Sequence, residues 1–134
     1  MSTLLDNFYG HDYTRLPNLR FLCPNRYREA LAKCYQPGDL LKLKQDFDNF
    51  RRPNSLAWAE PMAKGQVVMF VEDAVFYSHE HSLVGFSPYK TISAFLYKDK
   101  FIFLPGSMKG RDELCEVRTR HETILERVCN EHCF

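Results

Sequence analysis

Two histidines separated by a single residue, His79 and His81, are the first side chains that could carry out chemistry. On an extended strand both would project to the same face, so two imidazoles could share a metal ion. The neighbouring residues, among them Ser82 and Gly85, are typical of a solvated loop, and no third ligand can be identified. A metal-dependent hydrolase centred on this pair is therefore one functional hypothesis, and an ordinary loop is the alternative.

A second group of metal-ligand side chains comprises Cys129, His132 and Cys133. Thiolates and imidazole are good zinc ligands, but a structural zinc site needs a fourth. Cys115 or His121 could supply it, although nothing in the spacing selects either. The alternative is a set of free thiols at the end of a helix. We therefore expect no cofactor, and zinc is the only one that the pattern could support.

Nucleophilic catalysis finds little support. A catalytic cysteine needs a neighbouring base that lowers its thiol pKa, and the sequence predicts none beside Cys23, Cys34 or Cys115. Buried cysteine is among the commonest core residues. The six glycines form neither of the common phosphate-binding loops. We assign no catalytic residue, and we favour a protein that is not an enzyme.

Two segments are predicted to be long loops, residues 45–57 and 78–88, and arginine and aromatic residues lie in them or directly beside them. Such side chains dominate the energetics of protein interfaces. We therefore predict a small adaptor or inhibitor that binds a protein partner, with these contact residues: Arg51, Arg52, Trp58, Phe86 and Tyr89.

RNA or single-stranded DNA binding is the runner-up. Lys90, Lys98 and Lys100 are interleaved with Tyr97 and Phe101, and cations beside aromatic rings are the chemistry of single-strand recognition. The alternative is a solvated rim around core aromatics, which we favour because acidic residues interrupt the positive surface.

Composition agrees with a binding domain of ordinary size. The chain has 134 residues, 45% of them hydrophobic and 26% charged, with a net charge of +1. These values exclude a disordered tail or a rod, and they argue against bulk binding of nucleic acid. The five cysteines are odd in number, and we identify neither a secretory signal nor a membrane-spanning run. We expect free thiols in a reducing cytoplasm and no membrane partner.

The periodicity predicts a single α+β domain over residues 1–134. An N-terminal segment with a helix (1–35, helix 26–34) precedes a β-rich core (36–106), and a C-terminal helix follows (110–131). Strands are expected at 40–44, 56–59, 67–71, 74–77, 91–97 and 101–104, with a break at Glu72–Asp73, a turn at 98–100 and an end to the sheet at Pro105–Gly106. His121 lies on the apolar stripe of the last helix, as a core histidine or as a pH-sensitive contact.

The β-rich core resembles SH3-like barrels of the KOW type, as found in some viral or phage accessory proteins. The likeness rests on Pro37–Leu43, Ala63–Val68 and Tyr97–Pro105, where a Gly-Asp pair, a Lys-Gly turn and a final hairpin stand in the family's order. It implies a barrel of about five strands with a recognition function for proteins or RNA. A viral protein of this kind would act in the host cytoplasm.

Overall fold

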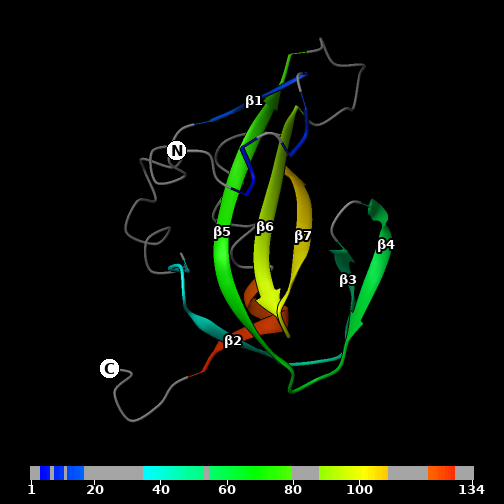
Figure 1. Cartoon of the computed structure of the whole chain (residues 1–134), viewed down its shortest axis with the longest axis vertical. Coiled ribbons are helices and arrows are strands. Elements are labelled where there is room, and N and C mark those ends of the chain that lie inside the picture. Colours follow the sequence, from blue (N-terminus) through cyan, green and yellow to red (C-terminus); the bar gives the residue numbers. More distant parts are fainter. Residues whose placement is uncertain are drawn as a thin grey trace.

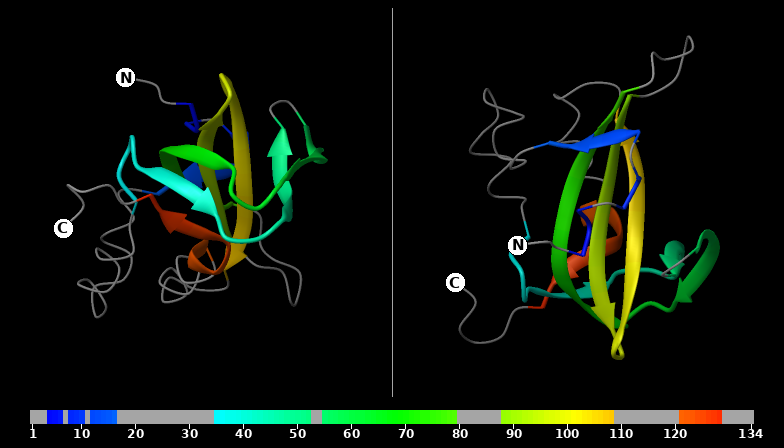
Figure 2. Two further views of the ribbon diagram at one scale, coloured as in Figure 1. Left: turned by 90° about the horizontal axis from the view of Figure 1, so that it is seen from below. Right: turned by 45° about the horizontal axis from the view of Figure 1, so that its top comes forward.

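The computed structural model describes residues 4–6, 8–10, 12–16, 35–52, 55–79, 88–108 and 121–128. These residues form one curled, wholly antiparallel sheet (Figures 1 and 2). Its hydrogen-bonded order is β4-β3-β7-β6-β5-β2-β8, and β1 pairs with β5 outside this path. The strands are β1 (Tyr13–Arg15), β2 (Leu40–Leu43), β3 (Phe47–Arg52), β4 (Ser55–Met62), β5 (Val67–Ser78), β6 (Tyr89–Tyr97), β7 (Lys100–Met108) and β8 (Leu125–Arg127).

The expected α+β fold with a helix at each end is wrong, because the described chain is almost entirely sheet. Its helical content is one turn over residues 121–124, and β8 follows at once. Leu125 pairs with Leu43 of β2, so strand pairing there overrides the helical spacing of the sequence. Residues 26–34 and 110–120, which were predicted to be helical, lie outside the described residues.

The expected long loop at residues 45–57 is also wrong. Residues 47–52 and 55–62 form the β3–β4 hairpin. Phe50 is fully buried, whereas most of its polar neighbours on β3 face solvent. A strand with one solvent-exposed face carries charged and amide side chains, and such residues in the sequence are also typical of a loop. The register of the hairpin shifts between Phe47 and Phe50, and again between Arg51 and Arg52.

The expected break at Glu72–Asp73 is a β-bulge within the single long strand β5. Phe70 pairs with Phe95 of β6, and Glu72 pairs with the next residue, Ala94. One extra residue, Val71, is therefore inserted into β5. Such an insertion exchanges the faces to which the following side chains point.

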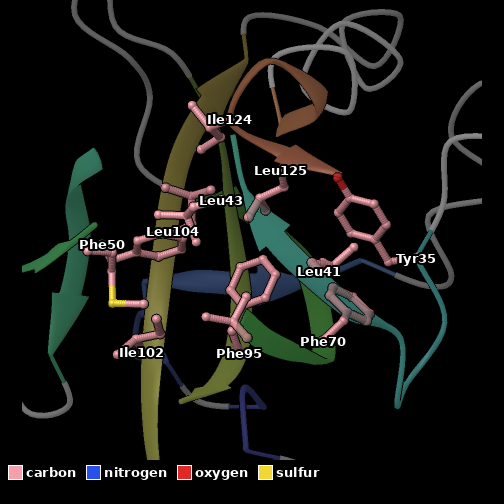
Figure 3. Close-up of a cluster of buried hydrophobic side chains, with 12 residues drawn as sticks. Tyr35, Leu41, Leu43, Phe50, Phe70, Phe95, Ile102, Leu104, Ile124 and Leu125 are labelled. Carbon is pink, nitrogen blue, oxygen red and sulfur yellow. The ribbon is translucent and has the colours of Figure 1, made fainter. Parts of the chain in front are cut away.

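The sheet consequently has apolar clusters on both faces. Val68 and Phe70, which precede the bulge, belong to the main core with Phe95 (Figure 3). Ala74 and Phe76, which follow it, belong to a second core. Figure 2 (right) shows the N-terminal segment in front of the sheet and the helical turn of residues 121–124 behind it. Each of the two covers one of these cores.

The hairpin of β6 and β7 was predicted correctly at its turn. Lys98 and Asp99 both have positive φ values, 46° and 67°, as a two-residue type I′ turn requires. The predicted end of the sheet at Pro105–Gly106 is wrong, because β7 continues to Met108. Gly106 pairs with Thr91, and a Cβ atom at Gly106 would lie 2.6 Å from Thr91 Oγ1.

We expect Gly106→Ala to lower the free energy of unfolding by about 1–3 kcal/mol, the usual cost of forcing an atom into a packed site. Urea denaturation would measure it. In a Thr91→Ala background, which lacks Oγ1, the same substitution should cost clearly less. Equal costs in the two backgrounds would show that the contact is not the cause.

Candidate binding surface

Three of the five predicted contact residues lie on the β3–β4 hairpin at one side of the sheet (Figure 1). They are Arg51, Arg52 and Trp58. Tyr89 begins β6 at its opposite end from the Lys98–Asp99 turn, where its ring packs 5.1 Å from the ring of Tyr77. Phe86 lies outside the described residues. The structure therefore separates Tyr89 from the hairpin.

Trp58 is the most exposed large apolar side chain among the described residues, with 64% of its surface accessible. Its position explains this exposure. Arg51 pairs with Ala59 but Arg52 pairs with Ser55, so Trp58 falls within an irregular stretch of β4. Bulged residues are commonly turned away from the regular pleat. β4 also ends the strand order, and none of the described strands lies beyond it.

A buried carboxylate, Glu60 of β4, holds the β3–β4 hairpin to β7. The Glu60 side chain is only 11% exposed, and it forms two ion pairs. Arg52 Nε donates to Oε2 at 2.8 Å, and Lys100 Nζ donates to Oε1 at 2.6 Å. The hydrogen bond from Lys100 is the largest cause that lowers the pKa of Glu60; burial opposes it, and the bond from Arg52 adds to it. The sequence alone could not show this cluster, because it depends on the strand pairing.

Lys98 and Lys100 lie over the same aromatic ring. Their Nζ atoms are 5.2 Å and 5.9 Å from the centre of the Tyr97 ring. The Tyr97 hydroxyl donates to Gln66 Oε1 at 2.9 Å, which fixes the ring. We call Arg52, Lys98 and Lys100 the cationic rim. The rim joins the turn end of the β3–β4 hairpin, where Arg52 lies, to the β6–β7 turn.

Two pockets flank the β3–β4 hairpin. The larger, of about 460 Å³, lies at the open end of the hairpin and has these lining residues: Asp46, Phe47, Asp48, Pro61, Met62 and Ala63. The smaller, of about 280 Å³, lies between Phe47, the end of β7 and the turn of residues 121–124. His121 lines the smaller pocket and is buried, as a core histidine would be. Thr123 of the same turn also lines the smaller pocket.

His79 contacts the N-terminal segment. Its Nε2 is hydrogen bonded to Thr14 Oγ1, a residue of β1. His81 lies outside the described residues, as do all five cysteines and His132. Within the described part of the chain, no three His, Cys, Asp or Glu side chains are grouped so that they could hold a metal ion.

The N-terminal segment is held by polar contacts at the edges of the second core. Arg15 pairs with Asp6 at 2.5 Å and with Glu72 at 3.7 Å, and Glu72 accepts a hydrogen bond from Leu5 N at 2.9 Å. The Tyr9 hydroxyl donates to Thr91 O at 3.3 Å. Burial, followed by the nearby Tyr13, raises the pKa of Tyr9 to about 12. These groups hold the N-terminal segment on the sheet.

No protein-family model, curated protein or solved structure matches this chain. The resemblance to SH3-like barrels therefore stays a prediction. Among the helices of the described residues, none is long and apolar enough to span a membrane.

We expect Glu60→Gln to lower the free energy of unfolding by on the order of 1 kcal/mol at neutral pH, since its two cationic partners are half exposed. Folding depresses the pKa of Glu60 below the ordinary 4.5. The stabilisation is therefore fully present above 4.5, and it is lost as the pH falls through the folded pKa. Urea titrations of both proteins at several pH values would show the difference shrinking in acid.

Asp48→Asn is the control for the Glu60 measurement, because Asp48 is an exposed carboxylate outside the Glu60 cluster. Its effect on stability should be small throughout. A difference between wild type and Glu60→Gln that stays constant from neutral to acidic pH would contradict the assignment.

Proposed function

We propose that this chain is a non-enzymatic protein-binding module, an adaptor or inhibitor, that contacts its partner through the β3–β4 hairpin. The observation that carries the proposal is Trp58, 64% exposed at the end of the strand order. An exposed tryptophan presents a large apolar surface to water, and a partner that covers it gains the free energy of burying that surface. Tryptophan and arginine are also among the residues most enriched in interface hot spots.

The surroundings of Trp58 suit a contact between folded proteins. The Glu60 cluster ties β4 to β7 through Lys100, so the hairpin is held before any partner arrives. A surface that is already ordered loses less conformational entropy on binding. Arg51 and Arg52 flank the tryptophan on the neighbouring strand β3.

The chemistry of the described residues favours this proposal over the two others. Two lysines cover the Tyr97 ring that could otherwise stack on a base. His79, the centre of the hydrolase hypothesis, is engaged with Thr14. RNA or single-stranded DNA binding remains the alternative that the following experiment addresses.

We expect Trp58→Ala to weaken the partner by about 2 kcal/mol or more, roughly 30-fold in Kd. The tagged full chain would capture proteins from cytosol with and without nuclease. A partner that survives nuclease would be identified by mass spectrometry, purified and titrated against wild type and variant. Val67→Ala is the matched control, because Val67 is also an exposed apolar strand residue (43%) but lies on β5.

Tyr89→Ala tests whether the start of β6, away from the β3–β4 hairpin, takes part in the contact. If the hairpin is the contact surface, this substitution should change the affinity by less than about 1 kcal/mol. A Kd that is unchanged by Trp58→Ala, or partners that vanish with nuclease, would contradict the proposal.

A further inference from the structure

The turn end of the β3–β4 hairpin and the neighbouring β6–β7 turn together carry more basic than acidic residues. Four basic and two acidic residues lie on these two segments: Arg51, Arg52, Lys98, Lys100, Glu60 and Asp99. The surplus of two charges is concentrated, because Arg52 and Lys100 bind opposite oxygens of one Glu60 carboxylate. This is a local feature in a chain whose net charge is only +1.

The groups of the cationic rim still have hydrogen-bonding capacity. Glu60 uses Nε of Arg52 and one donor position of Lys100. A guanidinium has five N–H donors and an ammonium has three. The Arg52 and Lys100 side chains remain 51% and 46% exposed. Their other donors can therefore reach an acceptor that comes from solvent.

The rim is also positioned in advance. Glu60 fixes one donor of Arg52 and one of Lys100, and the tight turn at Lys98–Asp99 places Lys98 over the Tyr97 ring. Long cationic side chains usually lose much rotamer freedom when they bind a ligand. Because part of that freedom is already lost here, an incoming anion would be bound at a lower entropic cost.

We infer that the cationic rim is an anion-binding site for an acidic segment of the protein partner, with Arg52, Lys98 and Lys100 as its donors. This inference rests on the proposed function and defines the chemistry of the partner: Asp or Glu side chains beside an apolar residue that contacts Trp58. Charge-assisted hydrogen bonds to carboxylates are stronger than neutral ones. The acidic pocket formed around Asp46 and Asp48 lies at the opposite end of the hairpin, so the charge also gives the segment a direction.

The experiment is a selection from a random library of displayed 12-residue peptides on the full chain. The same selection is made on Lys98→Gln/Lys100→Gln and on a matched control, Lys42→Gln/Lys44→Gln. The control also neutralises two exposed lysines separated by one residue, Lys42 on β2 and Lys44 just after its end. We expect peptides that combine acidic and apolar residues to be enriched on wild type and on the control, and to be lost on the rim variant.

A selected peptide is then synthesised and titrated. Trp58 is the only tryptophan of the chain, so its fluorescence reports on binding beside it. We expect the emission to change on wild type, and the Kd to rise about three- to tenfold on the rim variant, as two exposed ion pairs allow. The affinity should also fall as salt is raised.

Several outcomes would overturn the inference: no enrichment, enrichment of sequences without acidic residues, or equal enrichment on wild type and the rim variant. A fluorescent 12-nucleotide RNA that binds wild type at physiological salt and loses binding on the rim variant would overturn it in favour of phosphate recognition. The proposed function fails separately. If acidic peptides bind Trp58→Ala as tightly as wild type, the rim binds anions but Trp58 is not part of the contact. If the partner is lost on Trp58→Ala but not on the rim variant, Trp58 is the contact and the rim is not.

Discussion

The bulge at Val71 is the constraint on which the rest of the sheet depends. It lets β5 contribute Phe70 to the core on one face and Ala74 and Phe76 to the core on the other. Without the extra residue, the second half of β5 would present its apolar side chains to the wrong face. A sheet with two buried faces needs a cover on each. The turn of residues 121–124 with β8 covers the first core, and the N-terminal segment covers the second.

The N-terminal segment and the β3–β4 hairpin both reach Phe103 of β7. Leu5, Phe8 and Tyr9 pack over the second core, near Phe103 and Phe76. β3 pairs with β7 through Arg51 and Phe103, so the hairpin is attached to the sheet by a short ladder and by the ion pair between Glu60 and Lys100. That ion pair and the burial of Phe50 hold the hairpin on the sheet.

Hydrophobic pattern predicted the centre of the sheet well and its margins poorly. The strands at 40–44, 67–71, 91–97 and 101–104 and the Lys98–Asp99 turn are confirmed, because long apolar runs and tight turns are local signals. The expected strand at 56–59 lies within β4, but its partner β3 was missed because most of the polar side chains of β3 face solvent. The helical spacing of the apolar residues around Leu125 predicted a helix there. The residues form β8 instead, because they pair with β2, which is distant in the sequence. Likewise Arg52 and Trp58 could be chosen by residue type, whereas Glu60 and Lys100 meet only through strand register.

The irregular stretch of β4 has a consequence for how this chain behaves at high concentration. An open strand edge is a template on which identical chains can assemble into fibres. Pro61 lacks an N–H group, and the register shift between Arg51 and Arg52 interrupts the ladder beside Trp58. Both features spoil the regular spacing of donors and acceptors that a copied strand would need. The irregularity that accompanies the exposure of Trp58 therefore also makes the edge of β4 a poor template for strand-by-strand assembly.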